Sequence, residues 1–394
     1  MNFKELTFFF CVLVIGFTPL DALTISDNLT LGYVFFILMV ICAILSRSFI
    51  PPKNEPKFAK VLIVFIVWAA LTSIWSYNIE TTLYRVMYLI QYFMIVLVML
   101  NVINTPKRLR IVLGAWVLGA LYIAIKTATN FSVFAVNSYD LYRVEEFGNP
   151  NENSFMLVWA LVFVYLIDST KRKIPSLLFT LVSAYTIVAN GSRMGFILFV
   201  VALVGFILSL FNKKMNPFQI IAIVILLYVG SYLLIQFIPD SSLSRFMAIG
   251  SNLENHELSH RDIIWTAAFN ALSENYQYLL IGSGWGTFNG AIKMYAGEAI
   301  GSHNFYINVL FTTGVIGIII VLYYLYVLYQ YITKTNNRTV VLYLVLIIPL
   351  ISMSSTNWDS RRWWFLMGAF IFLILKTNMF NYEKSNPTRK SGNN

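Results

Sequence analysis

His303 and Asn304 stand directly before a long apolar segment, and their side chains could do acid–base chemistry. Imidazole titrates near neutral pH and is costly to place at a membrane edge without a purpose. It could accept a proton as a general base while the asparagine amide orients it. All three histidines of the chain, His256, His260 and His303, fall in one polar interval. We therefore expect the chemistry there; the alternative is that His303 only begins the next helix.

Two arginines offer a second kind of chemistry, the binding of anions. Arg193 lies in a very short hairpin, residues 190–195, between two apolar segments. A charge in that position must face a polar cavity or pair with an anion. Arg261 opens a helical pattern further along the chain. A guanidinium is a planar fork that binds two phosphate oxygens together, so both residues predict phosphate binding. The alternative for Arg193 is snorkelling to lipid phosphate.

The long connection 239–303 contains an expected amphipathic helix over 261–274. We expect it to lie along the membrane surface with Trp265 at the interface. Its polar and apolar positions fall on opposite faces, namely Asp262, Thr266, Asn270 and Ser273 against Ile264, Ala268 and Ala271. In the glycine-rich turn 282–286 that follows, the backbone could approach a ligand closely. Gly284 and Trp285 are therefore candidate substrate-binding residues, with an ordinary loop as the alternative.

Two further pairs of residues are candidates for substrate binding. Asn149 and Asn151 belong to a turn-forming run before an apolar segment, and asparagine amides suit sugar hydroxyls because they both donate and accept. The alternative is a turn that caps the next helix. Arg361 and Arg362 stand among tryptophans and could bind an acceptor. For that pair, an aromatic belt with snorkelling cations is the alternative.

One motif matches a metal site in its spacing. Residues 256–260 read His-Glu-Leu-Ser-His, the zinc-protease pattern in which both histidines share one helix face. A fixed cation, Arg261, follows directly, and the flanking residues are polar. A third ligand would have to come from Glu274, Glu298 or His303, and none has a compelling position. We therefore predict no metal site, and Cys11 and Cys42 have no spacing that suggests a disulfide or metal framework.

The elements that must position these residues are membrane helices. The chain has 394 residues, of which 58% are hydrophobic and only 12% charged, which excludes an ordinary soluble protein. We expect an all-α polytopic membrane domain over residues 1–380 and a disordered basic tail over 381–394. Its large external loop, residues 239–303, separates the ninth helix from the tenth. Apolar periodicity predicts twelve transmembrane helices at about 5–20, 30–46, 59–76, 84–103, 109–127, 153–168, 175–190, 194–211, 217–238, 304–332, 339–355 and 362–378.

Lysine and arginine placement predicts the orientation. With both termini in the cytoplasm, nineteen of the 28 basic residues fall on the inner side, and every inner connection carries some. The net charge of +10 therefore reflects topology, and we expect no nucleic-acid partner. Most of the nine outer basic residues are arginines, which suits anion binding. The outer residues are Arg85, Lys126, Arg143, Arg193, Arg245, Arg261, Lys293, Arg361 and Arg362.

In order and sidedness, these motifs resemble the O-antigen ligase and polymerase family. The resemblance covers the twelve-helix layout and is sharp over about 185–317. The residues that carry it are Ser192-Arg193, Arg261 with Trp265, the alternating glycines of 282–286, and His303-Asn304 followed by Gly314-Val315-Ile316-Gly317. The resemblance implies a multi-pass protein of the bacterial cytoplasmic membrane with its active site on the outer face. It also implies undecaprenyl-pyrophosphate-linked oligosaccharide and membrane lipids as partners, with flippase and chain-length regulator proteins as further candidates.

The resemblance implies a glycosyltransferase that needs no nucleotide sugar, cofactor or metal, and the outer face carries no Asp-x-Asp pair for a metal. An acceptor hydroxyl would displace the pyrophosphate with inversion. Arg193 and Arg261 would stabilise the leaving group, and His303 would take the proton. Asn304 would orient the imidazole or a sugar.

Several functions stay open at this level. A polymerase is favoured over a ligase because composition rich in isoleucine, asparagine and lysine is typical of surface-polysaccharide gene clusters. A flippase or other transporter would suit twelve helices, but transporters place ionisable groups near the bilayer midplane, and the predicted spans hold almost none. An intramembrane zinc protease is the third alternative.

Overall fold

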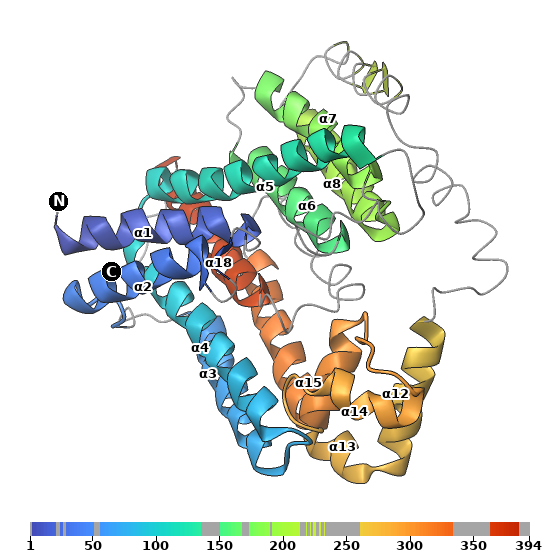
Figure 1. The fold of residues 1–394 in the computed structure, drawn as a ribbon. Coiled ribbons are helices and arrows are strands. Elements are labelled where there is room, and N and C mark those ends of the chain that lie inside the picture. The colour runs from blue at the N-terminus through green and yellow to red at the C-terminus, as the bar shows by residue number, and fades with distance from the viewer. Residues whose placement is uncertain are drawn as a thin grey trace.

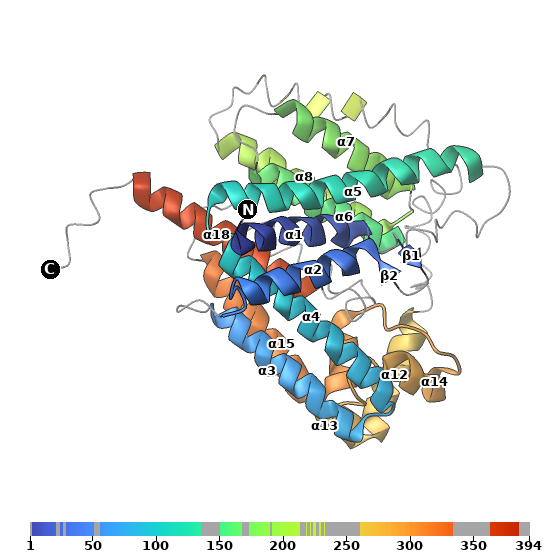
Figure 2. The same cartoon turned by 60° about the vertical axis from the view of Figure 1, so that its left-hand side comes forward.

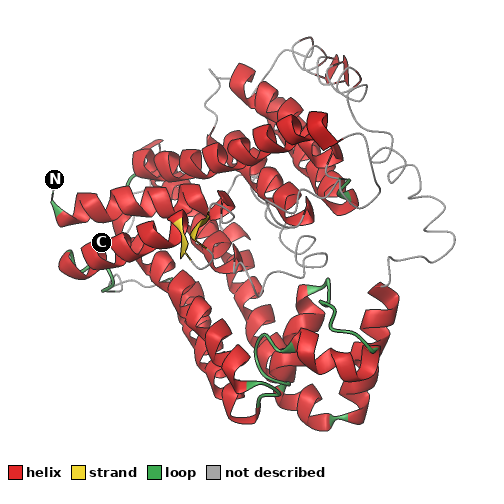
Figure 3. Ribbon diagram, in the orientation of Figure 1, coloured by secondary structure: helices red, strands yellow, loops and turns green. Residues whose placement is uncertain are grey.

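The computed structural model describes residues 2–20, 24–26, 29–50, 56–134, 150–167, 173–189, 191–212, 261–333 and 363–385, with isolated positions between 218 and 232. Helices dominate this part of the chain (Figure 3), which confirms the predicted all-α class. The exception is a short antiparallel ribbon between the first two helices, β1 (Thr24–Ser26) with β2 (Leu29–Thr30). The helices are α1 (Phe3–Phe17), α2 (Leu31–Leu45), α3 (Lys57–Leu71), α4 (Ile79–Val102), α5 (Pro106–Phe134), α6 (Pro150–Ile167), α7 (Lys173–Ala189), α8 (Arg193–Asn212), α12 (Arg261–Glu274), α13 (Tyr276–Ile281), α14 (Phe288–Ala296), α15 (Phe305–Thr333) and α18 (Trp363–Ser385), with one-turn helices η1 (Thr18–Leu20) and η2 (Thr72–Trp75).

Ten of the twelve predicted helices correspond to a helix of the structure. The predicted segment 339–355 lies outside the described residues, and only isolated positions of 217–238 are described. Helix α18 extends to Ser385, past the predicted start of the tail, and residues 386–394 lie outside the described part.

The membrane prediction is supported in part. Within the described ranges, four helical segments are long and apolar enough to cross a bilayer, and four shorter helices are apolar. A count of twelve crossings therefore stays a prediction. The four long segments are Lys57–Trp75, Ile79–Val102, Pro106–Thr127 and Phe305–Thr333, and the shorter helices are Leu31–Leu45, Pro175–Ala189, Arg193–Gly205 and Phe365–Lys376.

The main hydrophobic core runs through α1–α8, α15 and α18. Helix α6 is buried along almost its whole described length, so it forms the centre of one part of the bundle. Trp116 of α5 packs edge-on against Phe163 of α6 and Phe370 of α18, with ring centroids 6.0 and 5.8 Å apart. The long spans also leave large apolar side chains exposed, which suits helices surrounded by lipid. Figures 1 and 2 show α5–α8 as one group, while α12–α14 lie beside the end of α3 and the starts of α4 and α15.

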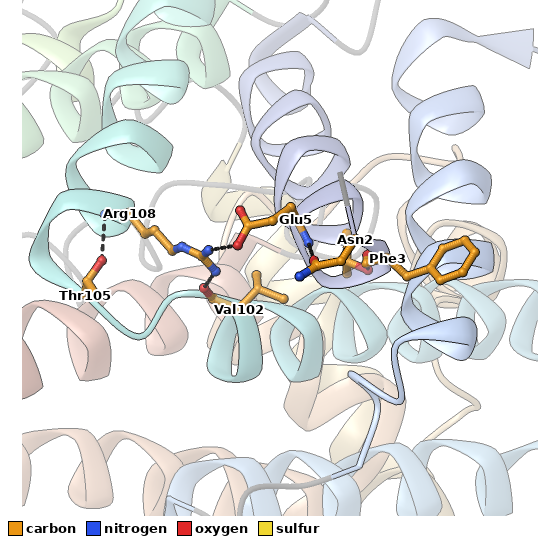
Figure 4. Close-up of polar contacts among 7 residues, drawn as sticks. Asn2, Phe3, Glu5, Val102, Thr105 and Arg108 are labelled. Atoms are coloured by element: carbon orange, nitrogen blue, oxygen red, sulfur yellow. Dashed lines mark hydrogen bonds and ion pairs between the residues drawn. The ribbon is translucent and has the colours of Figure 1, made fainter.

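Polar contacts tie together the helix ends at one side of the bundle. Arg108, in the first turn of α5, forms an ion pair with Glu5 of α1 and donates to the Val102 carbonyl at 2.9 Å (Figure 4). Asn101, near the end of α4, donates to the Ser48 carbonyl after α2 at 2.9 Å. The starts of α1 and α5 thus share one end with the ends of α2 and α4. This is the arrangement that four successive crossings require.

Candidate functional site

The segment that carries His303 is held firmly on both sides. Ser302 is fully buried, and its hydroxyl donates to the Asn304 carbonyl at 2.9 Å. The Asn304 side-chain oxygen accepts from the backbone N–H groups of Tyr306 (2.9 Å) and Ile307 (3.2 Å), so it caps α15. His303 itself is half-buried with a positive φ of 48°. The local fold therefore fixes the backbone from which the imidazole projects.

Helix α12 brings Arg261 into the same neighbourhood. Its bounds, Arg261–Glu274, are those expected from the sequence, and Ile264, Ala268 and Ala271 are buried as predicted. Trp265 does not serve only as an interface anchor, because its indole N–H donates to the Ser302 carbonyl at 2.8 Å. Arg261 lies one turn before Trp265, and residues four apart share a helix face. One hydrogen bond thus ties the Arg261 face of α12 to the residue preceding His303.

The apolar face of α12 is covered by protein. It packs in a second hydrophobic cluster with Phe288, Ala291 and Ile292 of α14 and with Ile307 and Phe311 of α15. Protein therefore covers this face, and the expectation that α12 lies along the membrane surface stays a prediction. Helices α12–α14 and the start of α15 form one packed unit. We call residues 261–313 the external unit, after the side of the membrane predicted for them.

The electrostatic setting of Arg261 suits an anion. The side chain is half-buried, and burial lowers the pKa of its guanidinium from the ordinary value. It occupies the first turn of α12, where the helix dipole is unfavourable to a cation. In the part of the chain that the structure describes, the Arg261 side chain makes no ion pair or hydrogen bond. A bound anion would supply the missing charge compensation.

The glycine-rich turn joins the external unit to a break in α15. Gly314 has a φ of 68° and interrupts the helix. The Phe311 and Thr312 carbonyls accept from the backbone N–H groups of Ser283 and Gly284, both at 3.0 Å. These bonds satisfy carbonyl groups that a regular helix would use within itself. Gly314 also packs against the Leu280 backbone, as expected for a glycine that permits close contact.

Gly284 and Trp285 have packing roles in this fold. Gly284 has a φ of 109° and no room for a Cβ beside Ser76 and Thr82. Trp285 is fully buried, stacks edge-on with Phe65 at 5.2 Å, and donates its backbone N–H to Thr72 at 3.0 Å. The predicted contact of these two residues with substrate has no support here, because the turn approaches protein and not an open surface.

Arg193 belongs to a second group of residues. It begins α8, directly after Ser192, whose buried hydroxyl accepts from the Gly195 N–H at 3.1 Å. Gly195 packs closely against Ser154 of α6, in the turn after Asn151. The structure thus brings the predicted candidates Asn151 and Arg193 to the junction of α6 and α8. Asn151 lies in the first turn of α6, which begins at Pro150 instead of the predicted residue 153.

These two groups are on different parts of the fold, since α8 lies with α5–α7 and α12 with α13–α15 (Figures 1 and 2). Convergence of Arg193 with Arg261 and His303 in one cleft stays a prediction. Five further residues of interest lie outside the described residues: Asn149, His256, His260, Arg361 and Arg362. Among the residues that are described, no group of three or more His, Cys, Asp or Glu side chains could hold a metal.

The sequence reasoning missed Ser302, which supports His303 from one side. Its type gives a weak signal, because a serine two residues before a helix-capping asparagine is common in loops. Only its full burial and its two contacts, with Trp265 and Asn304, distinguish it.

The structure is that of a helical membrane protein. It has apolar helices long enough to cross a bilayer, and the external unit packs at one end of them. Residues 178–322 match the family model described as O-antigen ligase. This segment runs from α7 into α15 and contains Arg193, Arg261 and His303. This match supports the resemblance to the O-antigen ligase and polymerase family that the motifs suggested, over the domain formed by residues 178–322. The comparison with curated proteins found no match.

Proposed function

We propose that this protein is a surface-polysaccharide polymerase. It transfers an undecaprenyl-pyrophosphate-linked glycan onto a hydroxyl of another lipid-linked repeat unit at the outer face of the bacterial cytoplasmic membrane. The observation that carries the proposal is the hydrogen bond from Trp265 to the Ser302 carbonyl. This bond joins the helix of Arg261, whose side chain has no partner among the described residues, to the segment that carries the half-buried His303. Both residues lie within the segment that matches the family.

The reaction is an inverting displacement. The acceptor oxygen attacks the anomeric carbon from the face opposite the diphosphate, and the electron pair of the breaking C–O bond remains on the diphosphate oxygen. His303 takes the proton of the attacking hydroxyl. Arg261, with Arg193, stabilises the negative charge that develops on the leaving diphosphate. In this mechanism the guanidinium groups take the charge-neutralising role that a metal ion has in other enzymes.

Asn304 acts by positioning His303. Its side-chain oxygen is occupied by two backbone N–H groups, and the residue is buried. The amide is thus committed to the cap of α15. We assign Asn151, Asn149, Arg361 and Arg362 to the binding of the glycan or the acceptor, as the sequence suggested. Flippase and chain-length regulator proteins are the partners that such an activity would need.

A ligase is the second candidate, and the description of the matching family model as O-antigen ligase favours it. In that case the acceptor is a lipid or another molecule, and the roles of His303 and Arg261 are the same. A strain that lacks a polymerase displays at most single repeat units. A strain that lacks a ligase accumulates complete lipid-linked chains.

The test replaces Arg193, Arg261 and His303 singly by alanine and follows surface glycan on gels. We expect each change to reduce elongation by about 10²–10³-fold, the usual cost of one electrostatic contact in a transition state. Lys293→Ala is the matched control, because Lys293 is an exposed cation at the end of α14 and should be dispensable. Membrane levels of each variant are measured by immunoblot. Unchanged long-chain glycan in all three site variants would rule out the assigned roles.

A further inference from the structure

Arg85 is a charged residue inside a helix that can span the membrane. Helix α4 runs from Ile79 to Val102, so Arg85 lies about 9 Å along the axis from the start of the helix. The sequence predicted a start at residue 84, which would have left Arg85 at the helix edge. An ionisable residue within a span is costly and points to a function.

The stem of the side chain lies against the external unit. Gly286 has a φ of 79°, and a Cβ there would lie 3.0 Å from the Arg85 Cβ and 3.3 Å from its Cδ. The turn that carries Gly286 is fixed to the start of α4, because the Tyr77 N–H donates to the Ser283 carbonyl at 2.7 Å. The missing side chain of Gly286 thus makes room for the stem of Arg85 on a rigid support.

The half-buried guanidinium has no ion pair or hydrogen bond with any described residue. Its Nε is buried without a hydrogen-bond partner, and Arg85 forms no ion pair with any described residue. Arg108 shows how this protein satisfies a structural arginine. Its guanidinium contacts the Glu5 carboxylate and donates to the Val102 carbonyl at 2.9 Å (Figure 4). It also lies over the ring of Phe8, 4.7 Å from the ring centroid. A partly buried guanidinium without such partners is unfavourable in free energy. An anion bound beside Arg85 would supply the partner that the described chain does not.

We propose that Arg85 binds a phosphate oxygen of the lipid-linked substrate at headgroup depth. This inference rests on the proposed function, which supplies a lipid diphosphate at the outer end of α4. The side chain is held under the turn 282–286, within the segment that matches the family, and so it acts beside the external unit. An ordinary phospholipid headgroup offers the same phosphate chemistry, and the experiment must separate the two sources.

The experiment measures binding of undecaprenyl diphosphate to the full-length protein in nanodiscs of phosphatidylcholine. Its readout is the ligand-induced rise in melting temperature over a titration. We expect Arg85→Ala to weaken binding roughly 10- to 100-fold, as for the loss of a charge-assisted hydrogen bond. Arg85→Lys should weaken it less, because lysine keeps the charge and loses the fork.

Arg108→Ala is the matched control, and it should change the stability of the protein but not its affinity for the ligand. Its loss leaves Glu5 unpaired, so the melting temperature without ligand should fall while the ligand-induced rise is kept. Arg85→Ala should melt without ligand at the wild-type temperature or higher, since it removes an unpaired charge. If it fails to fold, the lysine variant serves the same titration.

Two results would overturn the inference alone. One is wild-type affinity for undecaprenyl diphosphate in Arg85→Ala. The other is an effect of Arg85→Ala only on retention of phosphatidylglycerol in mixed nanodiscs, which would make Arg85 a headgroup anchor. If the wild-type protein does not bind undecaprenyl diphosphate at all, the proposed function fails together with the inference.

Discussion

His303 has a left-handed backbone, a conformation that costs free energy for a residue with a Cβ. The buried hydroxyl of Ser302 and the helix cap of Asn304 hold it in place. Its side chain is half-buried, as a general base requires if it is to meet substrate and still be oriented by the protein. At the residue scale the candidate site thus consists of the supported imidazole of His303 and, on the adjoining helix, the guanidinium of Arg261, which has no partner among the described residues.

The cap of α15 gives a prediction for single residues. Asn304→Ala should destabilise the protein by about 1 kcal/mol because the first turn of α15 loses its acceptor. It should also slow elongation by about 10²-fold, since a small displacement of His303 misaligns the proton transfer. Asn304→Asp keeps an acceptor oxygen and should recover most of both properties, as judged by thermal unfolding and by glycan length on gels. An inactive but fully stable Asn304→Asp would show that the amide N–H₂ contacts substrate.

At the scale of elements, the break in α15 joins the external unit to the membrane helices. Gly314 releases the carbonyl groups of the preceding turn, and they accept from Ser283, Gly284 and the Trp68 indole, the last at 2.9 Å to the Thr313 carbonyl. A helix can leave its regular path in a membrane only where such partners exist. The glycine-rich turn and the glycine of the break are therefore one structural device, although more than twenty residues separate them in sequence.

This coupling predicts that adding a single methyl group at Gly314 strongly destabilises the protein. Gly314→Ala should lower the free energy of unfolding by more than about 2 kcal/mol, because a Cβ at a φ of 68° is strained and meets the Leu280 backbone. Gly114→Ala in α5 is the matched control. No atom lies within 4 Å of its added Cβ, so the change should be neutral or slightly stabilising. Thermal unfolding in detergent measures both, and equal melting temperatures would contradict the proposed coupling.

At the scale of the whole molecule, the polar contacts collect at two ends. Glu5, Arg108 and Asn101 join neighbouring helix ends at one end of the bundle. At the other end, the external unit packs against the end of α3 and the start of α4. Excess lysine and arginine at the first end agrees with a cytoplasmic location. Membrane sidedness follows as a prediction.

Labelling with a membrane-impermeant maleimide measures this sidedness. Lys293→Cys, at an exposed position of α14, should react in intact cells. Lys107→Cys, exposed at the start of α5, should react only after lysis. The two native cysteines, Cys11 and Cys42, are buried and should give little background. The reverse pattern would invert the topology and place His303 in the cytoplasm.

Local patterns predicted much of this molecule. The apolar periodicity located most of the helices, and the amphipathic pattern located α12 to the residue, because both depend on neighbours within a few positions. The same patterns did not show what covers the apolar face of α12. An apolar helix face specifies burial but does not say whether lipid or protein covers it.

The types of His303, Arg261 and Arg193 and their order along the chain followed from the sequence alone, since composition and hydropathy are properties of the chain. Only the tertiary structure showed that Trp265 donates to the Ser302 carbonyl and that Trp285 is buried. It also showed that the Arg85 Nε has no partner in the described chain. These are contacts between segments far apart in sequence. Their geometry depends on which side chains pack against which glycines, as Arg85 does against Gly286, and local sequence patterns do not contain that information.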